Sequence, residues 1–197
     1  MLISQCPYYL NQKGFTLIET IVGMVVLAIS FSVLTTLIHP VAQQSADQLH
    51  QVKAAELAQS VLNEIQNKAF DNNSDMAGGR LRCGETDAPD CSTDMGPETV
   101  SGIKETRATF NDVDDYDGLK YGPDEDDEKE IKNSQGQPLS LYIGYSMSIS
   151  VRNDANYDGS FPTTPLPRAI SAAKLITVTI TTPTDFSMSF STYRANF

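Results

Sequence analysis

The chain has 197 residues, of which 40% are hydrophobic, and this size allows one soluble domain with an appendage. Its 25 acidic side chains outnumber the 14 basic ones and give a formal net charge of -11. Such a surface repels nucleic-acid phosphates, so we expect no nucleic-acid partner. The charge is uneven, because the N-terminal quarter is almost uncharged and most acidic residues lie between Asp71 and Asp158.

The segment from Ile21 to Ile38 carries no charge and is long enough to cross about 30 Å of hydrocarbon as a helix. A secretory signal peptide would need a basic start and a small-residue cleavage site after the apolar run, and no good site follows Ile38. We therefore expect the segment to stay in the mature protein as a single membrane span. Lys13 favours a cytoplasmic N-terminus and translocation of the acidic region.

The hydrophobic pattern becomes amphipathic after Pro40, which we expect to kink or briefly break the helix because proline lacks an N–H group. Apolar residues then recur at three- and four-residue intervals up to about residue 70, where turn-forming residues follow. The helical face that this spacing predicts consists of Ala54, Leu57, Ala58, Val61, Leu62, Ile65 and Ala69.

Alternating apolar and polar residues predict three antiparallel strands, over residues 141–152, 176–180 and 186–190, with a turn at 183–185. A fourth strand is expected near residues 106–110. The segment from Asp112 to Asn133 is so highly charged that we expect it to contribute nothing to the core. The fold class is therefore α+β, with a long N-terminal helix whose first half spans a membrane and whose second half packs on an antiparallel sheet.

Three cysteines are present. Cys6 lies in the extreme N-terminal segment, whereas Cys83 and Cys91 form a C-x7-C pair in a polar, glycine-rich loop. Behind a membrane segment, such a pair indicates an oxidising compartment such as the periplasm. We therefore predict a disulfide between Cys83 and Cys91.

Asp154, Asn156 and Asp158 precede Gly159 and match the first half of a calcium loop, in which carboxylate and amide oxygens alternate. Position twelve of that loop would be Pro165 in place of a bidentate glutamate, which excludes an EF-hand. Two interpretations stay open at this point, a calcium site of another shape and a solvated turn between strands.

A second oxygen-rich cluster contains Asp112, Asp114 and Asp117, and it is compatible either with bound calcium or with a solvated loop. We expect no other cofactor. The sequence contains no nucleophile or nucleotide-binding motif, and polar surroundings predict ordinary pKa values for the carboxylates. We therefore expect a protein that is not an enzyme.

The residues from Lys13 to Glu19 read Lys-Gly-Phe-Thr-Leu-Ile-Glu and directly precede the apolar run. An acidic side chain at the membrane core costs about 2.5–3.5 kcal/mol on insertion scales, so Glu19 should have a partner unless it reaches the headgroups. A cut between Gly14 and Phe15 would create an α-amino group four residues before Glu19. That cation could pair with the carboxylate of a neighbouring subunit and align the two subunits axially.

This motif and its apolar tract resemble the class III signal of type IV pilins and type II secretion pseudopilins. The resemblance implies a leader over residues 1–14, cleavage after Gly14 by a prepilin peptidase, and methylation of the new N-terminal Phe15. It also implies that Glu19, the fifth residue of the mature chain, interacts with the terminal amine of a neighbouring subunit. The implied partners are other pilin subunits, the assembly machinery and the peptidase.

In that family the order of parts would be a filament-core helix over residues 15–40, an amphipathic second half over 41–70 and a periplasmic head over 71–197. The implied location is the bacterial inner membrane, crossed once, and then the pilus filament.

A narrower resemblance links the head to the MshD-type minor pilins of mannose-sensitive haemagglutinin (MSHA) pili. The segments that carry it are Arg82–Glu85, Phe110–Tyr116 and Tyr193–Phe197. It implies a low-abundance subunit that starts the filament or lies near its tip. Two alternatives stay open, a type II secretion minor pseudopilin and a pilus tip adhesin or other ligand-binding module.

Overall fold

A computed structural model describes residues 14–76, 79–92, 94–125, 128–159 and 172–196, and for residues 37–43 it describes the backbone alone. Of the predicted leader, only Gly14 is among the described residues. The chain forms two units, residues 1–46 and 47–197, and each is considered by itself below.

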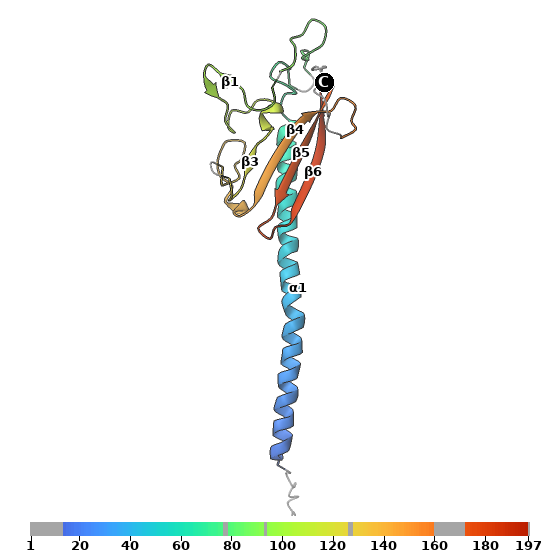
Figure 1. Cartoon of the computed structure of the whole chain (residues 1–197), viewed down its shortest axis with the longest axis vertical. Coiled ribbons are helices and arrows are strands. Elements are labelled where there is room, and N and C mark those ends of the chain that lie inside the picture. The colour runs from blue at the N-terminus through green and yellow to red at the C-terminus, as the bar shows by residue number, and fades with distance from the viewer. Residues whose placement is uncertain (1–13, 77–78, 93, 126–127, 160–171, 197) are drawn as a thin grey trace, which may run out of the picture. The chain divides into compact units, whose positions relative to one another are not determined.

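The first element is α1, a helix over Leu17–Gln66 that contributes to both units (Figure 1). Its Leu17–Thr36 segment is long and apolar enough, by length and composition, to cross a membrane. The helical backbone continues through Pro40, so the alternative of a break in the helix is wrong. Proline lacks only its own N–H group, so the helix loses a single backbone hydrogen bond at this position and continues beyond it.

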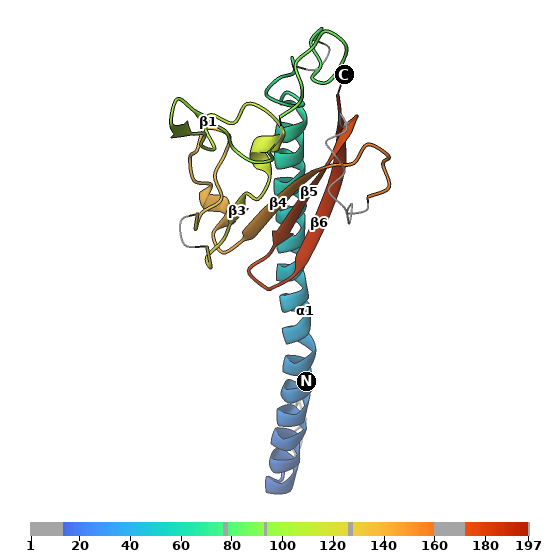
Figure 2. The same cartoon turned by 45° about the horizontal axis from the view of Figure 1, so that its top comes forward.

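In the second unit, the C-terminal part of α1 lies against one face of the sheet (Figures 1 and 2). The apolar face predicted from the sequence is confirmed, because every member of it is buried. These residues are Ala54, Leu57, Ala58, Val61, Leu62, Ile65 and Ala69.

The sheet has the strand order β3–β4–β5–β6, and all neighbouring strands are antiparallel. Its members are β3 (Lys120–Tyr121), β4 (Ser146–Asn153), β5 (Ala173–Thr181) and β6 (Ser187–Ala195). The register pairs Met147 with Ile180, Ile149 with Val178, and Val151 with Ile176, and all six side chains are buried. The α+β fold class and its three predicted antiparallel strands are therefore confirmed.

Two strand predictions were wrong. Strand β4 begins at Ser146 rather than near Leu141, because Ser140–Tyr142 forms the short 3-10 helix η2 and Gly144 adopts a φ of 81°, which interrupts an extended strand. Residues 106–110 form a turn, in which the Phe110 N–H donates to the carbonyl of Thr106 at 3.1 Å. The fourth strand of the sheet is β3 instead.

The expectation that residues 112–133 stay outside the core was also wrong. Val113, Tyr116, Tyr121 and Ile131 belong to the hydrophobic core, and Val113 precedes the 3-10 helix η1 (Asp114–Tyr116). Between them, Asp112 accepts the Asp114 N–H and Asp114 pairs with Lys174, so charged and core residues alternate along the same segment.

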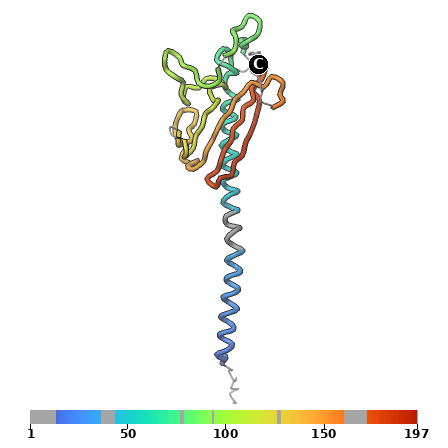
Figure 3. The backbone as a smooth tube through the Cα atoms, viewed as in Figure 1, coloured from blue at the N-terminus to red at the C-terminus, as the bar shows by residue number. Residues whose placement is uncertain are grey.

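The C-terminal end of β6 lies beside the loop that follows α1, as the chain trace shows (Figure 3). Asn196 fixes this arrangement, since its Nδ2 donates to the carbonyl oxygen of Cys83 at 3.1 Å. A separate two-stranded hairpin, β1 (Thr99–Val100) and β2 (Ile103–Lys104), completes the described elements.

Candidate functional site

The residues predicted for processing and assembly lie at the start of α1. Gly14 and Phe15 precede the helix and are exposed, and Phe15 has 79% of its surface accessible. Glu19 lies in the first turn, where its N–H donates to the carbonyl of Thr16 at 3.0 Å. Among the described residues, no side chain forms an ion pair with the Glu19 carboxylate.

The polar residues of the apolar segment bond within the helix itself. The hydroxyls of Thr20 and Ser30 donate to the carbonyls of Leu17 and Val26, each at 2.8 Å, and Thr35 donates to Phe31 at 3.0 Å. A hydroxyl group in hydrocarbon has no water to bond with, so a hydrogen bond to a carbonyl of its own helix is favourable there. Glu19 is the charged residue of this segment, and no ion-pair partner for it lies in the described part of the chain.

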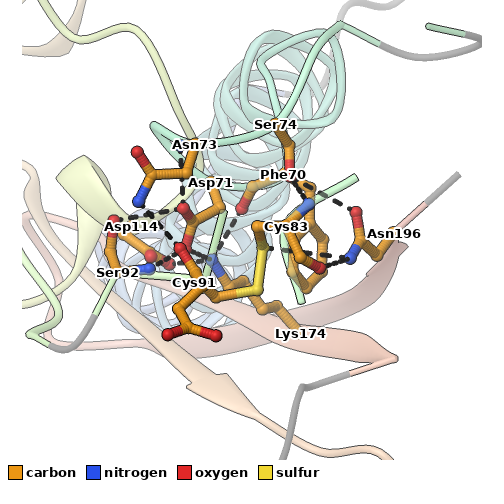
Figure 4. Close-up of a disulfide and its surroundings, with 11 residues drawn as sticks. Phe70, Asp71, Asn73, Ser74, Cys83, Cys91, Ser92, Asp114, Lys174 and Asn196 are labelled. Carbon is orange, nitrogen blue, oxygen red and sulfur yellow. Dashed lines mark hydrogen bonds and ion pairs between the residues drawn. A yellow bond between two sulfur atoms is a disulfide. The ribbon is translucent and has the colours of Figure 1, made fainter. Parts of the chain in front are cut away.

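Cys83 and Cys91 form a disulfide in the loop after α1 (Figure 4). The Cys83 N–H donates to the Ser74 hydroxyl at 2.9 Å, and the Asp71 carboxylate accepts the N–H of Ser92 at 2.8 Å. Closing so short a loop stabilises the folded chain by about 2.5 kcal/mol in the chain-entropy description. Together these bonds fasten the loop to the end of the helix.

Lys174 on β5 is buried beside this disulfide (Figure 4). Its Nζ lies 2.5 Å from Oδ1 of Asp114 and 3.6 Å from Oδ2 of Asp71, and it donates to the carbonyl of Phe70 at 2.6 Å. Burial raises the pKa of Asp114 to about 6 despite the opposing effect of Lys174. One lysine thus holds two buried carboxylates from distant parts of the sequence.

A second, partly buried ion pair joins α1 to the loop before η1. The Arg107 guanidinium contacts both carboxylate oxygens of Glu64, at 2.5 and 2.7 Å, and the Tyr116 hydroxyl donates to Glu64 at 2.7 Å. Burial opposes ionisation of Glu64, but the hydrogen bonds from Arg107 and Tyr116 prevail and lower its pKa.

The predicted calcium ligands Asp112, Asp114 and Asp117 have separate partners. Oδ1 of Asp112 accepts the N–H of Asp114 at 2.7 Å, Asp114 pairs with Lys174, and Oδ1 of Asp117 accepts the N–H of Val151 at 2.8 Å. Burial, followed by the charges of Asp114 and Asp115, raises the pKa of Asp112 to about 7, so the expected ordinary pKa values were wrong here. Calcium binding by this set stays a prediction.

Asp154, Asn156 and Asp158 organise the loop after β4. Oδ2 of Asp154 accepts the Tyr193 hydroxyl at 2.7 Å and the Gly159 N–H at 2.9 Å, and the first of these bonds lowers the pKa of Asp154. Asn156 donates to Asp158 at 2.6 Å. Pro165 lies outside the described residues, and calcium binding here also stays a prediction.

Comparison with known proteins bears on the N-terminal segment. Residues 9–35 match the family model of the prokaryotic N-terminal methylation motif. The motif supports a type IV pilin-like or pseudopilin subunit. Such a subunit is structural and interacts with other pilins, with a prepilin peptidase and with the membrane. No curated protein and no solved structure matches the chain.

The methylation motif contains Gly14, Phe15 and Glu19, which the sequence pattern had already singled out. The pattern missed Lys174, Glu64 and Arg107 as partners of buried charges. A lysine within the apolar β5 sequence was the available signal for the first of them.

Proposed function

We propose that the chain is a pilin-like subunit that is cleaved after Gly14, methylated at Phe15 and packed through α1 into a filament. The observation that carries this proposal is the position of Glu19. It lies in the methylation motif on an exposed apolar helix, and among the described residues no cation pairs with it. A charge in hydrocarbon requires a counter-charge, and the amine of a cleaved neighbouring chain would supply one.

Before assembly, the Leu17–Thr36 segment would anchor the subunit in the inner membrane with the disulfide-bonded head in the periplasm. Its exposed apolar side chains would then pack against the same segment of other subunits. A head-to-tail contact of this kind that does not close into a ring generates an open helical filament. One surface thus serves as bilayer anchor and later as filament core.

Replacement of Glu19 separates processing from assembly. In Glu19→Gln we expect normal removal of the leader and at least a tenfold loss of the subunit from sheared filaments, because the carboxylate that pairs with the neighbouring amine is gone. The amounts in filaments and membranes would be compared by immunoblotting, with Glu56→Gln as the control on an exposed part of α1. Wild-type amounts of the Glu19 variant in filaments would contradict the proposal.

For the type of filament, we propose a minor pilin of the MSHA type. Two of the three segments that resemble MshD-type pilins meet in the structure, through the bond from Asn196 to Cys83. The third segment provides Asp114, which pairs with Lys174 in the same region. The segments that resemble MshD-type pilins therefore contain residues that hold the head together. This favours a head structure shared with those pilins.

Deletion of the gene distinguishes this role from that of a secretion pseudopilin. We expect loss of surface pili with secretion intact. Loss of protein secretion with normal piliation would assign the chain to a secretion system instead.

A further inference from the structure

The β1–β2 hairpin brings two glutamates together. Ser101 and Gly102 both have positive φ angles, of 54° and 82°, as a two-residue type I′ turn requires. Beyond the last pair of this hairpin, the Glu105 N–H donates to the carbonyl of Glu98 at 2.9 Å. Two acidic residues therefore lie opposite each other, an arrangement that destabilises paired strands unless a cation intervenes.

The 3-10 helix η1 adds a third carboxylate to this pair. Asp115 is fully buried, and its Oδ2 accepts the backbone N–H groups of Asn111 and Asp112 at 2.7 and 3.1 Å. These bonds fix the orientation of the carboxylate. One oxygen from each of Glu98, Glu105 and Asp115 lies within 4.8 Å of the other two.

Four oxygens of this cluster have no hydrogen-bond donor in the described part of the chain, although they are shielded from solvent. They are both carboxylate oxygens of Glu98, Oε2 of Glu105 and Oδ1 of Asp115. No described lysine or arginine forms an ion pair with any of the three residues. Carboxylate oxygens that are shielded from solvent and have no donor are unfavourable, although Glu98 and Glu105 are half-buried as whole residues. This geometry calls for a bound cation or for protons shared between the carboxyl groups.

The electrostatic surroundings agree with this geometry. Burial, together with the negative charges of Asp112 and Asp115, raises the pKa of Glu98 to about 8. Burial and the neighbouring Asp115 also raise the pKa of Glu105. A divalent cation would remove the repulsion that these carboxylates otherwise experience.

We propose that Glu98, Glu105 and Asp115 bind one calcium ion, which fastens the β1–β2 hairpin to η1. The donor set contains oxygen alone, which suits a hard cation, and the four oxygens without donors can supply about four of the 6–8 ligands that calcium takes, with water as the rest. The other Glu105 oxygen, Oε1, accepts the Asn111 side-chain amide at 3.0 Å. Asp115 also lines a cavity of about 450 Å³. The site is independent of the filament role proposed above.

Calcium titration of the full mature chain in detergent, after treatment with EDTA, tests this site. We expect one calcium ion per chain by calorimetry and a higher melting temperature with calcium than with EDTA. Glu98→Gln and Glu105→Gln should each weaken calcium binding at least tenfold. Glu130→Gln, at an exposed position, is the charge-matched control and should leave binding unchanged.

The effect of Glu98→Gln on the melting temperature should have opposite signs without and with calcium. In EDTA at neutral pH it should melt above the wild type, because folding no longer has to protonate or bury this carboxylate, and in calcium it should melt below it. Absence of calcium binding to the wild type would overturn the site and leave shared protons as the explanation. Binding that survives both glutamine variants but is lost in Asp154→Asn would place the ion in the loop after β4 and would equally overturn it.

Discussion

The carboxylates of the apolar part of α1 and those of the head differ in their surroundings. Glu19 lies on an exposed apolar surface, whereas the half-buried Glu98 and Glu105 meet the buried Asp115 in the head. Among the described residues, neither region supplies a cation to these groups. We assign the missing charge to a neighbouring subunit in the first case and to calcium in the second.

The head also contains buried carboxylates that have a partner within the chain. Lys174 holds Asp71 and Asp114, and Arg107 holds Glu64. These pairs join distant segments and require nothing from outside. We therefore infer that the carboxylates paired within the chain hold the head together, whereas Glu19 and the Glu98 cluster bind a partner from outside it.

Replacing Lys174 would leave Asp71 and Asp114 without the cation that pairs with them. We expect this change to lower stability more than a replacement of Glu64. Lys174→Met leaves two buried carboxylates without their cation, so we expect the free energy of unfolding to fall by about 4 kcal/mol. Denaturant unfolding of the chain in detergent measures this change, with the exposed Lys129→Met as the control. A loss no larger than that of the control would show that Asp71 and Asp114 do not depend on Lys174.

Replacing Glu64 tests whether its ion pair with Arg107 stabilises the head in a pH-dependent way. We expect Glu64→Gln to lower the free energy of unfolding by about 2 kcal/mol at neutral pH, because the charged hydrogen bonds to Arg107 are weakened. The folded protein lowers the pKa of Glu64 below its ordinary value of 4.5, so this contribution is complete above 4.5 and is lost as the pH falls through the folded-state pKa.

Unfolding of the wild type and of Glu64→Gln over a range of pH would reveal this trend. The difference between the two proteins should narrow below pH 4.5, whereas Glu56→Gln should show no such trend. A difference that stays constant into the acid range would mean that the effect is not one of charge.

Local patterns in the sequence were enough to predict much of the fold. The spacing from Ala54 to Ile65 identified the buried face of α1 correctly, because helical periodicity depends on neighbouring residues alone. The alternation in β5 and β6 was equally informative. The start of β4 was misplaced because the φ of Gly144 interrupts a pattern that otherwise looks extended.

Contacts between distant segments could not be predicted in this way. The density of charge in residues 112–133 suggested exposure, yet the partner of Asp114 is Lys174, sixty positions away. The Glu98 and Glu105 cluster depends on a hairpin turn and on η1 together. In the N-terminal motif, by contrast, the informative residues are adjacent in sequence, so the motif over residues 9–35 can be found without knowledge of the fold.

Intact mass and N-terminal sequencing of the protein from its native membrane would establish whether the chain is processed as a pilin-like subunit. We predict a chain that begins at methylated Phe15. Gly14→Ala should give uncut protein, although no atom lies within 4 Å of the added methyl group to disturb the fold. A wild-type chain that begins at Met1, or one cut beyond Ile38, would contradict the account.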